Sequence, residues 1–147
     1  MPPVLLIMLL TVLIIMVAMS ASLYVVRQKI VGRAQAIRER FPTAKAIIPG
    51  ANFYGQESRG VAQMRGNGVL VLTGNELYFE MLVPRREFRI PLAAIQAVET
   101  PSSYLGKSNF RPILKVTFRD ESGSADSMGW LVPDVEGLKQ AIESAKG

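Results

Sequence analysis

Residues 3–26 read PVLLIMLLTVLIIMVAMSASLYVV and contain no Asp, Glu, Lys or Arg. A helix rises about 1.5 Å per residue, so roughly 20 apolar residues cross a hydrocarbon core about 30 Å thick. The most polar side chains of the stretch are the hydroxyls of Thr11, Ser20 and Ser22. They can bond back to helix carbonyls instead of facing lipid unsatisfied. The sequence therefore predicts a transmembrane helix over residues 3–26.

A cleaved signal peptide is the competing interpretation, because residues 20–22 are small, as a signal peptidase site requires. A signal peptide, however, begins with basic residues and has an apolar core of only about 7–15 residues. Residues 1–3 carry no basic side chain, the apolar run is longer, and Arg27 and Lys29 follow it directly. These features favour an anchor that stays in the membrane.

The net charge of the chain is concentrated directly after this helix. The chain has 17 Lys and Arg residues against 12 Asp and Glu, which gives a formal net charge of +5. Residues 27–45 contain only Glu39 as an acid against six cations, namely Arg27, Lys29, Arg33, Arg38, Arg40 and Lys45. This segment alone accounts for the +5. The positive-inside rule then predicts a cytoplasmic C-terminal domain in the cell membrane, with the N-terminus outside. Because the rest of the chain is neutral, nucleic acid is not expected as a partner.

The basic segment is also patterned as a helix. Ile30, Ala34, Ile37 and Phe41 recur on one helical face. Pro42 then ends the pattern, because the residue before a proline avoids the α region. We expect the transmembrane helix to continue as this amphipathic extension. Its cations either only set the topology or also bind anionic lipid, where each is worth about 1 kcal/mol.

Two small residues of the apolar stretch suggest how the helix could associate. Ala18 and Ser22 lie four residues apart on one face and form a small-xxx-small pair. The pattern predicts a possible homodimer through the transmembrane helix.

The residue types that are absent restrict the chemistry. The chain has no cysteine and no histidine, so it lacks thiolate chemistry as well as the commonest general base and metal ligand. Asp120 and Glu121 lie in a turn-like Asp-Glu-Ser-Gly-Ser run, which is typical of a solvated loop. We expect no enzyme, no catalytic residue, no metal site and no cofactor.

The remaining chain has a β pattern. Residues 43–60 are punctuated by Pro49-Gly50, Asn52, Gly55 and Gly60, which indicates an irregular linker whose only aromatic side chains are Phe53 and Tyr54. These aromatics are expected to contact the domain or the membrane interface. Seven candidate strands follow at 61–65, 68–73, 76–83, 86–92, 95–99, 113–119 and 125–132.

A capped helix closes the chain. Asp134 is a good N-cap and Glu136 lies in the first turn. An apolar helical stripe follows, made of Val135, Leu138, Ala141, Ile142 and Ala145. The predicted organisation is a transmembrane helix at 3–26, a basic juxtamembrane helix and linker at 27–60, and a mainly β domain at 61–147. The expected fold class is membrane-anchored α+β.

The β domain resembles the pleckstrin-homology-like (PH-like) fold, including its bacterial and GRAM-type variants. The residues that carry the resemblance are GVLVLTGNELYF at 68–79 and REFRIPL at 86–92, followed by Ile95 and Val98. The resemblance implies that the C-terminal helix plugs one open end of a bent sheet and that loops at the other end bind. It places Trp130, Val132, Leu138 and Ile142 in the core.

The usual ligand of that family, a phosphoinositide headgroup, is held by several cations near the first loop, whereas this chain offers only Arg65 there. The remaining candidate residues for binding a partner or an anion lie on two later loops, and they are Arg85, Arg86, Lys107, Asn109 and Arg111. The sequence predicts a non-enzymatic binding or scaffolding module with a protein partner. A module that binds anionic lipid headgroups is the alternative.

Overall fold

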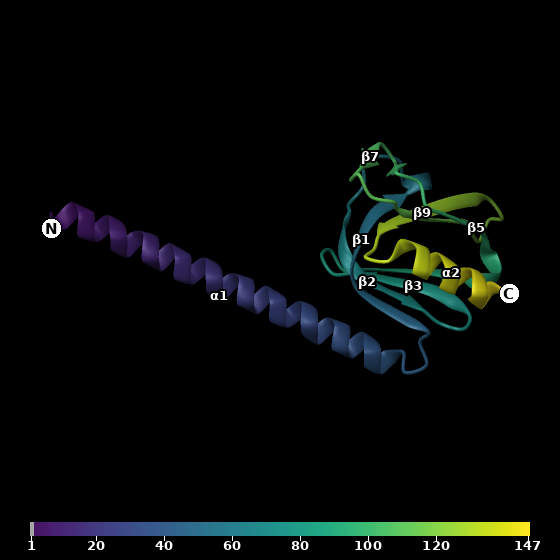
Figure 1. Cartoon of the computed structure of the whole chain (residues 1–147), viewed down its shortest axis with the longest axis horizontal. Coiled ribbons are helices and arrows are strands. Elements are labelled where there is room, and N and C mark those ends of the chain that lie inside the picture. The colour runs from purple at the N-terminus through teal and green to yellow at the C-terminus, as the bar shows by residue number, and fades with distance from the viewer. Residues whose placement is uncertain (1) are drawn as a thin grey trace. The chain divides into compact units, whose positions relative to one another are not determined.

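The computed structural model describes residues 2–147. The chain forms two compact units that divide after Ile37. The first is a stretch of the helix α1 (Pro3–Arg40), and the second, Arg38–Gly147, begins with the last turn of that helix. Figure 1 shows that the second unit holds every strand and the C-terminal helix.

α1 is one continuous helix, as the sequence predicts for the apolar stretch and its basic extension. Its hydroxyl groups are satisfied within the helix: Thr11 donates to the carbonyl of Ile7 at 2.5 Å, and Ser20 and Ser22 bond to the carbonyls four residues before them. The helix ends at Arg40, two residues before Pro42. Within residues 2–147 it is the one helix long and apolar enough to cross a membrane.

The second unit is built on a seven-stranded sheet in which all paired neighbours are antiparallel. Their order in space is β4-β3-β2-β1-β9-β8-β5. The strands are β1 (Ala46–Gln56), β2 (Gly66–Leu72), β3 (Glu76–Met81), β4 (Arg86–Pro91), β5 (Ile95–Glu99), β8 (Leu114–Arg119) and β9 (Ala125–Leu131).

Shorter elements lie in the connections. A small two-stranded sheet, β6 (Ser103–Tyr104) with β7 (Lys107–Ser108), interrupts the long connection from β5 to β8. Two 3-10 turns, η1 (Glu57–Arg59) and η2 (Leu92–Ala94), follow β1 and β4. The helix α2 (Val135–Lys146) ends the chain. The fold is therefore α+β: a long apolar N-terminal helix, a seven-stranded antiparallel sheet and a C-terminal helix.

β1 occupies a segment that the sequence analysis treats as an irregular linker, so this prediction is wrong. Residues 46–53 pair with β2, and residues 52–56 pair with β9. The register shifts beside Gly50 and Gly55, whose φ angles are 77° and 137°. Pro and Gly are unfavourable in regular strands, but they form β-bulges that bend a strand and increase its twist. Here two bulges let one strand pair with both halves of the sheet.

The aromatic pair of this segment belongs to the domain. Phe53 and Tyr54 are buried, and the ring of Phe53 lies 4.9–5.8 Å from those of Phe79, Phe88 and Trp130. Of the two expected environments, the domain interior is the one observed.

The strand predicted at residues 61–65 is also wrong. β2 begins only at Gly66, and the preceding residues form a loop in which Val61 and Met64 are 65% and 60% exposed. The apolar residues of this loop have no strand to pair with, because β1 already occupies the edge of β2. The other six predicted strands coincide with β2, β3, β4, β5, β8 and β9.

α2 packs its apolar stripe on the core, as predicted. The side chain of Asp134 accepts a hydrogen bond from the amide of Gly137 and caps the helix. Leu138 and Ile142 are buried in the same cluster as Trp130 and side chains from all seven strands of the large sheet. Figure 1 shows α2 between β9 and β5 on one side and β2 and β3 on the other.

Candidate functional site

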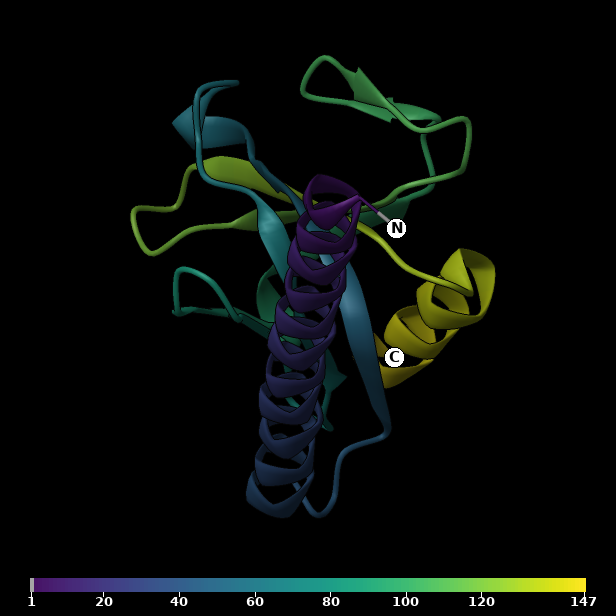
Figure 2. The same ribbon diagram turned by 90° about the vertical axis from the view of Figure 1, so that its left-hand side faces the viewer.

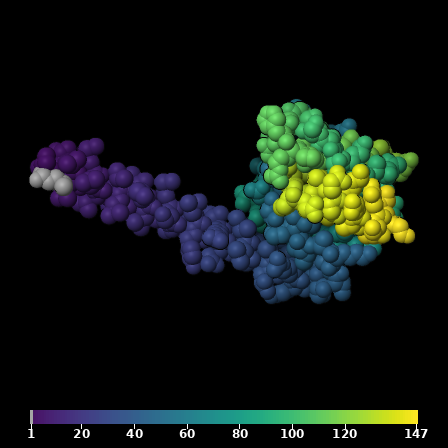
Figure 3. Space-filling view, viewed as in Figure 1, coloured from purple at the N-terminus to yellow at the C-terminus, as the bar shows by residue number. Residues whose placement is uncertain are grey.

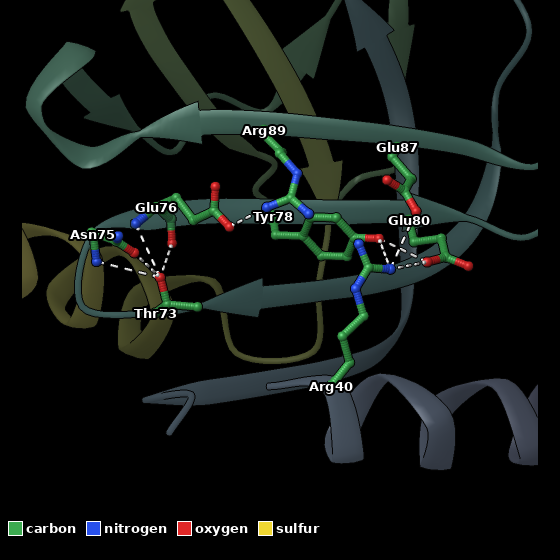
Figure 4. Close-up of polar contacts among 8 residues, drawn as sticks. All are labelled: Arg40, Thr73, Asn75, Glu76, Tyr78, Glu80, Glu87 and Arg89. Atoms are coloured by element: carbon green, nitrogen blue, oxygen red, sulfur yellow. Dashed lines mark hydrogen bonds and ion pairs between the residues drawn. The ribbon is translucent and has the colours of Figure 1, made fainter. Parts of the chain in front are cut away.

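The outer face of β3 and β4 carries a cluster of charged groups around Tyr78 (Figure 4). We call it the Arg40 cluster, and it comprises Arg40, Tyr78, Glu80, Arg85 and Glu87. The hydroxyl of Tyr78 donates to Glu80 at 2.7 Å, and one nitrogen of Arg40 donates to both Tyr78 and Glu87 at 3.2 Å. Glu80 is buried, with Arg40 at 3.6 Å and Arg85 at 3.5 Å.

The pKa shifts in the Arg40 cluster are caused by burial and by hydrogen bonds between its own members. The hydrogen bond from Arg40 lowers the pKa of Glu87 below its ordinary value of 4.5, and the same bond raises the pKa of Arg40. Burial raises the pKa of the Tyr78 phenol, as does its hydrogen bond to Glu80. All these shifts strengthen the ordinary neutral-pH charge states. The cluster is therefore suited to fastening residues 38–41 to the sheet and not to transferring protons.

An aromatic contact supports the same junction. The rings of Phe41 and Tyr78 have centroids 4.8 Å apart, and the guanidinium of Arg40 lies 5.2 Å from the centroid of the Tyr78 ring. On its other side, Arg89 lies 4.8 Å from the same centroid and pairs with Glu76. Tyr78 is thus held between two guanidinium groups.

These contacts change the expectation for two of the candidate cations. Arg40 is expected at a membrane surface with the rest of the basic segment, but its guanidinium contacts Tyr78 and Glu87 of the domain. Arg85, expected as a free cation at a hairpin tip, lies 3.5 Å from Glu80 and 3.8 Å from Glu87. Neighbouring Arg86 is half-buried at the start of β4. Arg27, Lys29, Arg33 and Arg38 lie along α1, and Lys45 is exposed just before β1.

Arg65, the candidate cation of the first loop, also makes contacts within the domain. Its Nε donates to the carbonyl of Tyr54 at 2.5 Å, and a terminal nitrogen donates to the carbonyl of Leu105 at 3.5 Å. The guanidinium therefore joins the loop before β2 to the β6–β7 hairpin. This use of Arg65 positions two loops and leaves no cluster of cations at the first loop.

The remaining candidates lie on the connection between β5 and β8, which is anchored firmly at its base. The hydroxyl of Tyr104 contacts both the carbonyl (2.9 Å) and the hydroxyl (2.7 Å) of Ser127, and burial raises the pKa of Tyr104 to about 12. Ile113 is fully buried, and its amide donates to the carbonyl of Pro101 at 2.8 Å. Tyr104 and Ile113 form a small second core with Tyr54 on the outer side of the sheet.

The distal part of this connection is exposed and basic. We call Lys107, Asn109, Phe110 and Arg111 the basic aromatic tip. All four are exposed, and Phe110 is 100% exposed as a residue, with a backbone φ of 54°. Figures 2 and 3 show the hairpin and this loop, in green, standing out at one end of the domain. Within residues 2–147, Lys107 and Arg111 make no ion pair.

A third polar group lies near η1, where Asp126 is buried. Its carboxylate accepts from Gln56 at 2.6 Å and from the amide and hydroxyl of Ser58 at 3.0 and 2.7 Å. Burial alone would raise the pKa of Asp126, but these hydrogen bonds outweigh it and the pKa is lowered. The carboxylate is fully bonded and orders the turn after β1. Among residues 2–147 no three His, Cys, Asp or Glu side chains are grouped as a metal would require.

The sequence located the tip through its cations but missed Phe110. The sequence predicts Lys107, Asn109 and Arg111 as binding residues on a loop, and the structure places them on the exposed β6–β7 hairpin and the loop that follows it. The missed signal is an aromatic residue between polar and basic neighbours, in a stretch from residue 100 to 119 without a single Asp or Glu. An aromatic side chain in such a loop can be buried in the domain, like Tyr104, or exposed, like Phe110. Only the tertiary structure shows which of the two it is.

Comparison with known proteins gives the fold alone. No protein-family model matches the chain, and no curated protein matches it. One similar solved structure is a chain of the 8S snRNP assembly intermediate, with a TM-score of 0.55, 10% identity, and coverage of 71% of this chain and 82% of that one. Another is the C-terminal domain of an unknown protein from Leishmania infantum, with a TM-score of 0.54, 14% identity, and coverage of 76% and 95%. At these identities the likeness concerns chain topology and carries no function.

Proposed function

We propose that this chain is a single-pass membrane protein whose C-terminal domain is a non-enzymatic binding module. The observation that carries the proposal is α1, whose residues 3–26 are uncharged, long enough to cross a bilayer and exposed along their whole length. Exposed Leu, Ile, Val and Met side chains in such number are stable in lipid and unfavourable in water. The basic residues that follow favour a cytoplasmic domain.

The proposed domain type is PH-like. Support comes from the order of the strands, in which β1 to β4 are sequential neighbours and β9, β8 and β5 continue the sheet from β1. The position of α2, packed on the core through Leu138 and Ile142, agrees with the helix expected at the end of such a domain. The likeness to solved structures is consistent with this topology but names no family.

The proposed binding surface is the basic aromatic tip. The two other polar groups, the Arg40 cluster and the carboxylate of Asp126, are engaged in internal hydrogen bonds and fasten segments of the domain. The tip instead presents its cations and an aromatic ring to the solvent. Exposed loops on a rigid scaffold are where binding residues concentrate.

Membrane extraction tests the anchoring. The wild-type chain should stay with membranes in alkaline carbonate. Replacing Leu13 and Met16 together by Arg should release it, since each central arginine costs about 2.5–3.5 kcal/mol on insertion. The matched control replaces Val31 and Ala36 by Arg, outside residues 3–26, and should leave the chain in the membrane. Release of the wild-type chain by carbonate would contradict the anchor.

A reporter fused after Gly147 tests the orientation. A reporter active only outside the cytoplasm should stay silent, because the cations after residue 26 favour the cytoplasmic side. Strong activity would place the domain on the other side of the membrane.

A further inference from the structure

We infer that the basic aromatic tip inserts Phe110 into the interfacial region of an anionic bilayer. The inference rests on the proposed function, since it names the partner of the same loop. The proposed partner is a lipid surface. The proposed inserting group is the aromatic side chain of Phe110, which is not among the candidate residues predicted from the sequence.

The first observation is the complete exposure of a large apolar side chain. Phe110 is 100% exposed, while the aromatic anchor Tyr104 of the same connection is 7% exposed. A single exposed Leu or Val is ordinary on a protein surface, but a fully exposed aromatic ring leaves a large apolar area in water. A lipid interface provides that burial.

The second observation is the backbone of the tip. Phe110 has a φ of 54°, in the left-handed region that bulky residues rarely adopt. Such a conformation is strained and persists where the surroundings impose it. The loop around Phe110 is held by hydrogen bonds: Ser108 donates from its hydroxyl to the carbonyl of Ser102 at 3.0 Å, and the amide of Ile113 donates to the carbonyl of Pro101 at 2.8 Å. The loop is held at its base while its tip points outward.

The third observation is the charge around the ring. Lys107 and Arg111 flank Phe110, and no acid occurs between Glu99 and Asp120. The second unit beyond residue 45 is neutral overall, so the positive charge of the tip is local. Near an anionic surface each cation strengthens binding about five-fold, and apolar insertion strengthens it further.

A neighbouring loop enlarges the apolar surface. Val61 and Met64 are 65% and 60% exposed on the segment that Arg65 joins to Leu105 of the hairpin. Two adjoining loops thus expose apolar side chains at the same end of the domain. A protein partner would need a pocket matched to this convex shape, whereas lipid adapts to it. A bilayer is also always near a domain tethered to one, which makes even weak insertion effective.

The test places a fluorescent reporter at the tip of the full chain. The chain has one tryptophan, Trp130, which is 1% exposed and gives a constant background. The Phe110→Trp variant keeps an aromatic side chain at the tip. The variant is reconstituted in zwitterionic nanodiscs, and the quenching of its tryptophan fluorescence is measured in two arms. In the first arm the nanodisc itself contains brominated lipid. In the second arm brominated anionic vesicles are added to a nanodisc without brominated lipid. Brominated lipids quench a tryptophan only on contact.

We expect quenching of the Phe110→Trp variant by the anionic vesicles, several-fold above that of a Gln140→Trp variant, whose reporter lies on the exposed side of α2. Adding Lys107→Gln and Arg111→Gln should weaken vesicle binding about 30-fold, since two cations are removed. The matched pair Lys139→Gln and Lys146→Gln removes the same charge from α2 and should leave binding unchanged. High salt should reverse the quenching.

Quenching at position 110 no greater than at position 140 in both arms would overturn the inference and leave the tip to a protein partner. Quenching that is insensitive to lipid charge would overturn its anionic part. A Leu13→Trp variant tests the anchor separately: if brominated nanodisc lipid fails to quench it, the anchoring proposal fails, while the vesicle arm still decides the role of the tip.

Discussion

The ring of Tyr104 lies against the backbone of Gly129, in the space that a side chain there would need. A Cβ built on Gly129 would stand 2.6 Å from one ring carbon of Tyr104 and 2.8 Å from another. Gly129 pairs with Gly55 on β1, where a Cβ would meet Leu105 at 2.9 Å. Two glycines on neighbouring strands therefore form the flat surface on which the β6–β7 hairpin rests.

We expect the Gly129→Ala substitution to destabilise the domain by about 1–3 kcal/mol, because the ring of Tyr104 must move out of a packed position. Unfolding of the full chain in detergent, followed through the fluorescence of buried Trp130, measures the loss. The control is Gly74→Ala, where a Cβ meets nothing within 4 Å. Equal stability of the two variants would show that the hairpin moves freely on the sheet.

The Arg40 cluster predicts an unequal cost for two arginines. Arg40→Gln removes hydrogen bonds to Tyr78 and Glu87 and the cation 3.6 Å from buried Glu80. Since Arg40 is 40% exposed, solvent screening reduces the loss to on the order of 1 kcal/mol. Chemical unfolding should detect it. Arg59→Gln on an exposed turn should change stability by less than about 0.5 kcal/mol. If Arg40→Gln lowered the stability no more than Arg59→Gln does, the Arg40 cluster would not fasten residues 38–41 to the sheet.

Asp126 predicts the response of the domain to acid. Its pKa in the folded domain is lowered from the ordinary value of 3.8, so it contributes stability above that value. The contribution is lost as the pH falls through the folded-state pKa. Urea unfolding at several pH values should show this decline in the wild type. Asp126→Asn should be less stable near neutral pH by about 1–3 kcal/mol and should depend less on acid.

The exposed turn residue Glu121 provides the control for this experiment. Glu121→Gln should keep the wild-type stability and acid dependence. If Asp126→Asn retained the full acid dependence, other carboxylates, such as Glu87, would be responsible for it.

The position of β1 predicts where the domain can be cut. A fragment of residues 38–147 keeps the whole sheet and the Arg40 cluster, and we expect it to be monomeric and cooperatively folded. A fragment of residues 50–147 loses the part of β1 from Ala46 to Pro49, which pairs with Leu72 to Val69 of β2. The exposed edge of β2 should then cause aggregation. Size-exclusion chromatography and circular dichroism compare the two fragments, and equal behaviour would show that the first part of β1 is dispensable.

Local patterns explain which elements could be predicted. The alternation of Leu114, Val116 and Phe118 with polar residues places β8 correctly, because one of its faces is buried and the other is not. The turn at residues 73–75 follows from its composition, and the hydroxyl of Thr73 indeed accepts the amide of Glu76 at 3.0 Å. β1 was not predicted, because the glycines at its two bulges, Gly50 and Gly55, are also typical of a linker. Only the pairing with β2 and β9 identifies the segment as a strand.

The candidate site was predictable only in part for a similar reason. A cation in a loop has the same sequence signal whether it is free, like Lys107, or bonded to carbonyls, like Arg65. The partners of Arg65 and Arg40 lie up to 47 residues away along the chain. No local pattern contains that information.

The sequence by itself determined the long apolar helix, its basic extension, the capped C-terminal helix and most strands, because each depends on neighbours within a few residues. Only the tertiary structure decided that Arg40 and Arg65 fasten segments of the domain and that Phe110 is exposed. Burial and pairing are set by contacts between distant parts of the chain: Tyr104 occupies the space beside Gly129, and nothing in the domain covers Phe110.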